Sequence, residues 1–249
     1  VLQHLRKVYP ARGGGKVTVA VDNLSLGIRR NSVFGFLGIN GAGKTTTMKM
    51  LTGDIPISKG RAYINGFSVV KQLAQVRKEV GYCPQFDPLL DLMTARETLT
   101  MYARIHGLPK KDIPEIVQQL LTTLGLGKFA DKQCGPFSGG AKRKVSLAMA
   151  LIGDPSVVFL DEPSTGMDPV SRRFMWSVIE SISDGRSVIL TTHSMEECEA
   201  LCSRIGILVN GSLKCVGRSQ HLKSRFGRGY QIDISTAGND AAAARVFIM

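Results

Sequence analysis

The sequence has no apolar stretch long enough to cross a membrane. Its apolar runs, such as residues 145–152, are short and interrupted by polar side chains, whereas a transmembrane helix needs roughly 20 apolar residues. The N-terminus has neither a Met nor a signal-peptide pattern, so we expect the chain to be a piece excised from a longer protein. Any membrane role must then come through other segments or subunits.

Cysteine is scarce and follows no ligand pattern. The five cysteines are an odd number and form no CxxC motif. Cys198 and Cys202 lie on one face of an expected helix, but the remaining ligands of a zinc site are missing. We therefore interpret all the cysteines as reduced thiols of a cytosolic protein.

Acidic residues are also in short supply, because 20 Asp and Glu stand against 32 Lys and Arg, for a net charge of +12. This excess fits a solvated basic surface, or attraction to nucleotide, anionic lipid headgroups or RNA, and charge alone does not choose among them. The chain has 249 residues, 43% of them hydrophobic. That length and composition fit one large α/β domain with subdomains, or two small domains, with a sizeable core.

Apolar runs and helical periodicity alternate along the chain. Expected helices cover residues 45–52, 92–106, 113–124, 139–153 and 170–183. Expected strands cover residues 17–28, 32–37, 61–64, 80–83, 157–161, 187–192 and 230–234, with a hairpin over 205–216. Strands that alternate with helices predict a parallel sheet with right-handed crossovers. The small and polar residues 237–244 are expected to be loose.

One loop between an expected strand and an expected helix has the pattern G-x-x-x-x-G-K-[ST]. Glycines allow the backbone N–H groups to turn inward around phosphates, and the helix start adds its positive dipole end. Lys44 can reach the β- and γ-phosphates, and the Thr45 hydroxyl can ligate Mg²⁺. The loop therefore predicts a site for MgATP. The predicted binding residues of the loop are Gly38, Asn40, Gly41, Ala42, Gly43, Lys44, Thr45 and Thr46.

Another glycine-rich stretch, residues 12–16, is basic but has no buried strand before it and no helix after it. We interpret it as a flexible surface turn.

Two further strand ends carry side chains suited to phosphate chemistry. One apolar run ends at Asp161 and Glu162, and another ends at His193. Asp161 can hold Mg²⁺ through water, and Glu162 can orient and polarise an attacking water as general base. Since the carboxyl ends of parallel strands meet at the nucleotide crevice, we expect His193 to contact the γ-phosphate.

A short segment upstream of Asp161 begins another expected helix with Ser138, Gly139 and Gly140. It resembles the signature sequence of ATP-binding cassette proteins, Leu-Ser-Gly-Gly-Gln, which in that family faces the γ-phosphate bound by the opposite subunit. The helix start would form a second anion site, or Ser138 is simply a helix cap. Phe137 and Ala141 depart from the usual form, but the Ser and both glycines that would meet phosphate remain.

Other positions resemble the same family. Gln85 is similar to the Q-loop glutamine that touches Mg²⁺ and couples to the membrane part, and Asp168 ends a segment similar to the D-loop of the dimer seam. Tyr9 lies where the family keeps an aromatic that stacks on adenine, although packing within a strand is the alternative. The resemblance covers about residues 1–225. It implies catalytic roles for Glu162, His193, Lys44 and Gln85, metal contacts for Thr45, Gln85 and Asp161, and nucleotide contacts for Tyr9, Ser138, Gly139, Gly140 and Asp168.

The resemblance also implies the fold class, an α/β P-loop NTPase (RecA-like) with a parallel-sheet core, an antiparallel β subdomain and an inserted α-helical subdomain. The implied divisions are residues 1–86 for the antiparallel β subdomain and the first part of the core, 87–146 for the helical signature subdomain and 147–226 for the second part of the core. Residues 227–249 would start a C-terminal regulatory region, partly disordered.

The segments 34–40, 82–87 and 137–144 resemble subfamily A, which comprises large eukaryotic transporters mostly of lipids and sterols, and they look closer to its second cassette than to its first. Residues 225–230 resemble the lead into the C-terminal regulatory region of that subfamily. The basic residues Lys142, Arg143 and Lys144 are interpreted as a solvated helix face, or as a contact to nucleotide or to a neighbouring subunit.

The implied function is hydrolysis of MgATP between two head-to-tail cassettes, which powers lipid or sterol translocation by transmembrane domains. The second cassette would belong to the same polypeptide or to a dimer partner. The resemblance places the chain at the cytosolic face of a membrane, with an isolated domain that is soluble and at most weakly dimeric.

Two alternatives stay open. One is a soluble cassette ATPase that acts on ribosomes or nucleic acid; the short region between Gln85 and Ser138 argues against it, and no nucleic-acid partner is expected. The other is a regulatory cassette that binds ATP with little turnover; the presence of Lys44, Glu162 and His193 argues against it.

Overall fold

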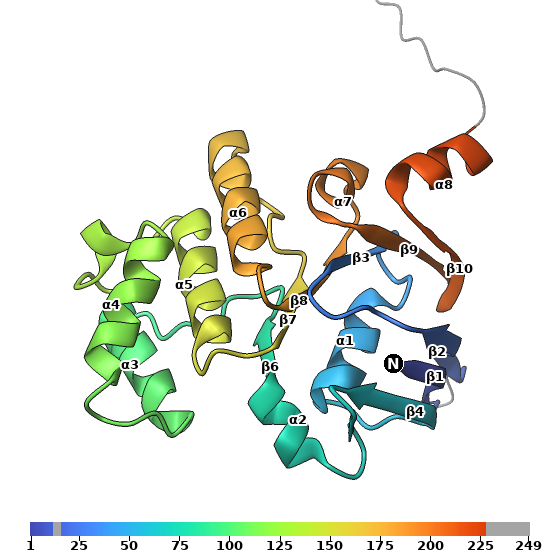
Figure 1. The fold of residues 1–249 in the computed structure, drawn as a ribbon, viewed down its shortest axis with the longest axis horizontal. Coiled ribbons are helices and arrows are strands. Elements are labelled where there is room, and N and C mark those ends of the chain that lie inside the picture. The colour runs from blue at the N-terminus through green and yellow to red at the C-terminus, as the bar shows by residue number, and fades with distance from the viewer. Residues whose placement is uncertain (12–15, 228–249) are drawn as a thin grey trace, which may run out of the picture.

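The protein is described here by a computed structural model that covers residues 1–11 and 16–227 (Figure 1). In these ranges the strands are β1 (Leu2–Tyr9), β2 (Thr18–Leu26), β3 (Val33–Leu37), β4 (Lys59–Ile64), β5 (Phe67–Ser68), β6 (Val80–Cys83), β7 (Val157–Asp161), β8 (Ser187–Thr192), β9 (Arg204–Val209) and β10 (Ser212–Gly217). The helices are α1 (Lys44–Thr52), α2 (Leu73–Glu79), α3 (Ala95–Ile105), α4 (Ile113–Thr123), α5 (Gly139–Leu151), α6 (Pro169–Ile182), α7 (Met195–Leu201) and α8 (Ser219–Phe226), with a 3₁₀ turn at Gly127–Phe129.

The described strands form two sheets. The antiparallel sheet has the order β2-β1-β4-β5, and the larger sheet has the order β10-β9-β3-β8-β7-β6. In the larger sheet β3, β6, β7, β8 and β9 are parallel, while β10 pairs with β9 in antiparallel fashion. This arrangement confirms the predicted parallel core with an added antiparallel sheet.

Strand β7 shows why the central strands read as unbroken apolar runs. Val157 and Phe159 pack into the core that the larger sheet shares with α1 and the antiparallel sheet. Val158 and Leu160 point to the opposite core, which contains residues of α3, α4, α5 and α6. Both faces of a covered parallel sheet are apolar, so the strand has no polar alternation.

The helices α3, α4 and α5 gather at one end of the molecule, and the antiparallel sheet lies at the other end (Figure 1). A capping box, in which the Thr94 side chain accepts from the Glu97 backbone and the Glu97 carboxylate accepts from Thr94, starts α3. Buried residues of α3 and α4, among them Leu99, Val117 and Leu121, join the core beside α5.

Most predicted elements are present, and β7 and β8 have the predicted bounds. Strands β1 and β5 and helices α2 and α8 were not predicted. Residues 12–15, the expected strand 230–234, the expected loose segment 237–244 and most of the expected regulatory start lie outside the described residues. The predicted subdomain boundaries stay predictions. Among residues 1–11 and 16–227, no helix has both the length and the apolarity needed to span a bilayer.

Candidate functional site

The loop between β3 and α1 has a backbone shape that favours glycine. Gly43, the residue before α1, has a φ of 100°, and a Cβ on it would lie 2.5 Å from the carbonyl oxygen of Ala20. Gly41 has a φ of 82°. A side chain at position 43 would therefore be strained and would collide with β2, so the glycine of the motif has a steric reason.

Lys44 begins α1 and is only 5% exposed. Its Nζ donates to the carbonyl oxygens of Gly38 at 2.7 Å and Ile39 at 3.3 Å. It also lies 3.6 Å from Oε1 of Glu162. The ammonium group is thus fixed at a helix N-terminus, where an anionic group is favoured by both the charge and the helix dipole.

A cleft of about 570 Å³ opens beside this loop. The predicted residues Tyr9, Gln85 and Glu162 line it together with the loop residues 40–46. Tyr9 is 39% exposed, and Nζ of Lys7 lies 5.1 Å from the centre of its ring. The structure therefore brings the end of β1 and the ends of β6 and β7 to the loop between β3 and α1.

Four residues that line the cleft were not predicted. Thr18, Val19 and Ala20 come from β2, and Asn210 comes from the turn between β9 and β10. The neighbouring Gly211 N–H donates to the carbonyl oxygen of Ala42 at 3.0 Å, which fixes this turn against the loop. A tight Asn-Gly turn gives the only sequence signal for this position, and that signal predicts a hairpin rather than a site.

Asp161 ends β7 and is 1% exposed. Its Oδ1 accepts a hydrogen bond from Oγ1 of Thr45 at 3.1 Å and from Oγ1 of Thr191 at 2.5 Å. Its Oδ2 is buried and accepts no hydrogen bond from the described residues. A buried carboxylate oxygen without a partner is costly unless a cation completes it. Asp161 and Thr45 therefore fit Mg²⁺, which prefers oxygen ligands.

Glu162 follows Asp161 with an unusual φ of 49°. Its backbone N–H donates to the carbonyl oxygen of Thr191 at 3.1 Å. Its Oε2 accepts from Nε2 of Gln85 at 3.3 Å and from Oγ1 of Thr165 at 3.2 Å. Nδ1 of His193 lies 3.6 Å from the same oxygen, and the His193 side chain is 54% exposed. The carboxylate of Glu162 therefore lines the cleft and accepts hydrogen bonds from neighbouring donors. The contribution of Thr165 was not predicted from the sequence.

The signature residues lie outside this cleft. Ser138 and Gly139 are exposed at the start of α5, and Oγ of Ser138 accepts from the Ala141 N–H at 3.3 Å. Asp168 caps α6, and its Oδ1 accepts from the Val170 and Ser171 N–H groups at 3.0 Å each. Hydrogen bonds from Ser171 and then from Val170 lower the pKa of Asp168. The predicted residues therefore occupy two separate surfaces of this chain.

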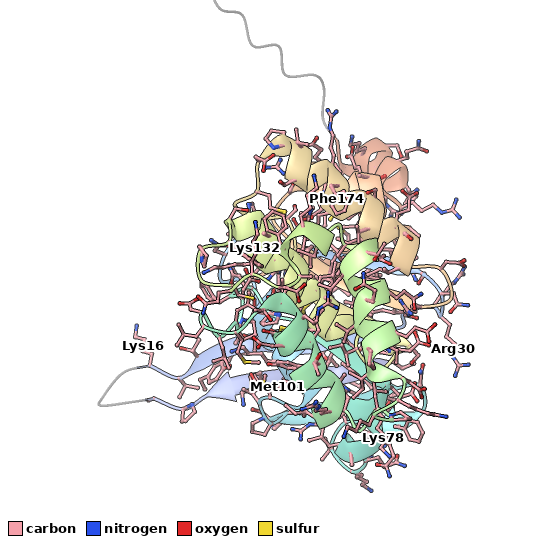
Figure 2. The ribbon with its side chains drawn as sticks, turned by 90° about the vertical axis from the view of Figure 1, so that its left-hand side faces the viewer. Lys16, Arg30, Lys78, Met101, Lys132 and Phe174 are labelled. Atoms are coloured by element: carbon pink, nitrogen blue, oxygen red, sulfur yellow. The ribbon has the colours of Figure 1, made fainter. Side chains whose placement is uncertain are left out.

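The interpretation of the basic residues of α5 as a solvated face is wrong for Arg143, which is 5% exposed. Nζ of Lys142 lies 3.4 Å from Oδ1 of Asp91. Nζ of Lys144 lies 3.7 Å from the ring centre of Phe174, a side chain labelled in Figure 2. Burial lowers the pKa of Lys144. Arg143 instead points inward and donates to backbone carbonyls. A run of basic residues looks the same in the sequence whether a member is solvated or buried.

The chain is similar to known proteins along most of its length. The family model described as ABC transporter matches residues 21–165. The ATP-binding cassette sub-family A member 2 of Rattus norvegicus is 56% identical over 236 residues, which cover 94% of this chain and 10% of the relative. The phospholipid-transporting ATPase ABCA3 of Rattus norvegicus is 51% identical over 233 residues, which cover 93% of this chain and 14% of the relative.

A solved structure shares the fold. The dimeric structure of a post-hydrolysis state of the ATP-binding cassette MJ0796, bound to ADP and Pi, has a TM-score of 0.80 at 20% identity and covers 92% of this chain and 99% of that chain. The chain spans only about a tenth of the length of its curated relatives, 10% and 14%. The predicted resemblance to subfamily A and the predicted fold class are confirmed. Because the family model covers more than half of the residues, the chain belongs to the ABC transporter family, as an ATP-binding cassette.

Proposed function

We propose that this chain binds MgATP in the cleft beside Lys44 and hydrolyses it when a second cassette covers the cleft. The observation that carries the proposal is the meeting of two distant segments. Lys44 Nζ lies 3.6 Å from Glu162 Oε1, and Thr45 Oγ1 lies 3.1 Å from Asp161 Oδ1. A fixed cation, a hydroxyl and one carboxylate line an open cleft, and a second, buried carboxylate is hydrogen-bonded to that hydroxyl. This set of groups suits phosphoryl transfer to water.

The proposed binding residues hold the nucleotide at three points. Lys44 and the N–H groups at the start of α1 take the phosphates, with the glycines allowing close approach. Tyr9, the last residue of β1, lines the cleft and stacks on the base. The other proposed loop contacts are Gly38, Asn40, Gly41, Ala42, Gly43 and Thr46.

Thr45, Asp161 and Gln85 are the proposed contacts of Mg²⁺. The orphan Oδ2 of Asp161 and the neighbouring Thr45 hydroxyl support this assignment. When bound, Mg²⁺ neutralises charge on the phosphate oxygens. Gln85 is proposed to serve both the metal and Glu162; the 3.3 Å distance from its Nε2 to Oε2 of Glu162 supports the second contact.

Glu162 is the proposed general base. Its carboxylate is nearly buried and accepts hydrogen bonds, so it can orient a water and take its proton. His193 projects from the end of β8 with an exposed ring, and it is the proposed contact to the transferred phosphoryl group. Lys44 stabilises the charge on the same group.

The second half of the site is proposed to come from another cassette. In this chain Ser138, Gly139 and Gly140 start α5 at the surface and away from the cleft, so they can serve only a nucleotide held elsewhere. Asp168, at the cap of α6, would lie along the same seam. The solved cassette of the same fold is described as dimeric and bound to ADP and Pi, which supports this arrangement. The divisions at residues 86, 146 and 226 are part of this proposal.

We further propose that hydrolysis powers lipid or sterol movement at the cytosolic face of a membrane, through transmembrane domains. The names of the relatives carry this step: ABCA3 is called a phospholipid-transporting ATPase. The match to the second cassette of subfamily A is part of the proposal.

Glu162→Gln in the full-length protein tests the catalytic assignment. The amide keeps the size of the side chain but cannot take a proton, so MgATP should still bind while phosphate release falls by about 100-fold or more. Reconstituted vesicles would then show that lipid movement stops together with hydrolysis. Unchanged phosphate release by this variant would remove Glu162 from the role of base.

A further inference from the structure

Helix α5 has an exposed N-terminus and, further along, a buried arginine. It begins at residues 138–140, of which Ser138 and Gly139 are exposed, and about one turn later it buries Arg143, which is 5% exposed. The start of the helix does not line the cleft of this chain. The buried arginine faces the loops that follow β6 and β7.

The guanidinium group of Arg143 uses all three nitrogens in these contacts. Nη1 donates to the carbonyl oxygen of Pro84 and to Oδ1 of Asp87, the latter at 3.2 Å. Nη2 donates to the carbonyl oxygen of Asp161 at 2.5 Å. Nε donates to the carbonyl oxygen of Pro163 at 3.2 Å. One side chain of α5 therefore joins the backbones that follow two neighbouring strands.

These backbones carry the groups around the nucleotide cleft. Pro84 immediately precedes Gln85, and Arg143 Nη1 also lies 3.4 Å from the carbonyl oxygen of Gln85. Asp161 and Pro163 flank Glu162 on both sides. The side chains of Gln85 and Glu162 are themselves 3.3 Å apart. A shift of Arg143 would therefore move both partners of this contact.

The contacts suit arginine and no shorter or simpler cation. A planar fork with five N–H groups can bind acceptors in several directions at once, whereas lysine presents a single nitrogen. The side chain of Asp87 is largely buried beside the guanidinium and supplies a compensating negative charge. An arginine that acted only as a solvated charge would need none of these acceptors.

We propose that Arg143 is a positioning residue that couples the two nucleotide sites of a cassette pair. This inference rests on the proposed function, because it requires residues 138–140 to serve the nucleotide of the partner while Gln85 and Glu162 serve the nucleotide of this chain. When the start of α5 engages phosphate, the helix shifts as one body and Arg143 passes that shift to the loops after β6 and β7. Occupancy of one site thereby sets the geometry of the catalytic groups in the other.

Arg143→Lys in the full-length protein is the sharpest test, because it keeps the charge beside Asp87 and removes the fork. MgATP affinity should stay within about twofold, since the phosphate loop is untouched. Turnover should fall by about tenfold or more, because misplacement of catalytic groups by an ångström can cost that much. The Hill coefficient for ATP in hydrolysis should fall toward that of independent sites. Arg143→Met, which also loses the charge, should show the same pattern more strongly.

Leu147→Ala is the matched control. Leu147 is buried one turn later on α5 as part of the hydrophobic core, and its side chain cannot hydrogen-bond to the two loops. It should lower the melting temperature and leave the Hill coefficient and turnover of the folded protein unchanged. This separates a positioning role of Arg143 from general loosening of the helix.

Unchanged turnover and cooperativity in Arg143→Lys would overturn the coupling role and leave the proposed function standing. Non-cooperative hydrolysis by the unaltered protein would overturn it as well. Failure of the unaltered protein to bind MgATP would instead overturn the proposed function. The two proposals therefore fail in distinguishable ways.

Discussion

Asp161→Asn removes a buried charge and keeps the shape of the side chain. Oδ1 of Asp161 accepts two hydroxyl hydrogen bonds, from Thr45 and Thr191, and an asparagine oxygen can accept both. The remaining oxygen, which no described residue satisfies, becomes a neutral amide. A buried charged oxygen without a partner costs more than a buried neutral amide without one, so we expect the nucleotide-free chain to become more stable by about 1 kcal/mol.

The same substitution should weaken nucleotide binding in the presence of Mg²⁺. The variant loses the anionic oxygen that fits the metal, and we expect at least about a tenfold loss of affinity, which is about 1.4 kcal/mol. Binding of ATP with a chelator present should be unchanged, because Lys44 and the phosphate loop are intact. A gain in stability with a loss of metal-dependent binding is typical of a group kept for function rather than for folding.

Urea unfolding without nucleotide gives the first quantity, and titration of ATP with Mg²⁺ or with EDTA gives the second. Asp154→Asn is the control, because Asp154 is an exposed carboxylate beside Arg186 and has a positive φ that asparagine also tolerates. Asp154→Asn should change neither the stability in urea nor the affinity for MgATP by much. If Asp161→Asn binds MgATP as tightly as the unaltered chain, our assignment of Asp161 to the metal is wrong.

Three further outcomes are expected. Gly43→Ala should cost more stability in thermal unfolding than Gly66→Ala. Both positions have a positive φ, which alone costs about 1–2 kcal/mol for alanine, but only at Gly43 would the Cβ meet a backbone oxygen, at 2.5 Å. Burial raises the pKa of the Cys83 thiol to about 12, so the thiol stays protonated near neutral pH and iodoacetamide should modify it more slowly than the partly buried Cys215, as peptide mass spectrometry would show. For this chain alone, calorimetry should detect MgATP binding far more readily than a phosphate assay detects hydrolysis. Equally easy detection of both would contradict a catalytic site shared between two cassettes.

The parts of the site that could be predicted from the sequence are those where chemistry leaves a local pattern. Gly41, Gly43 and Lys44 are consecutive in a loop whose backbone shape requires glycine, so the motif and the geometry coincide. Asp161 could be predicted because β7 is buried on both faces and reads as an apolar run that ends in acids. His193 followed from the same reasoning on β8.

The remaining parts depend on contacts between distant segments. Strand β1 pairs with β2 through several register shifts, and His4 has a positive φ, so its side chains do not alternate regularly. The β2 contribution to the cleft comes from an edge whose sequence carries no motif. Arg143 looks like a surface cation because the carbonyls that it binds belong to other strands. Such contacts have no signature along the chain.

A substitution at Ser138 tests most directly whether two cassettes share the catalytic site, because Ser138 is exposed and lies outside the cleft of its own chain. Ser138→Arg in the full-length protein should leave ATP binding to the loop around Lys44 unchanged, yet lower total phosphate release by about tenfold or more, since it blocks the site of the partner. Thr94→Ala, which removes the cap of α3, is the control for a lost helix cap and should keep its hydrolysis. Full hydrolysis by Ser138→Arg would contradict a site shared between two cassettes.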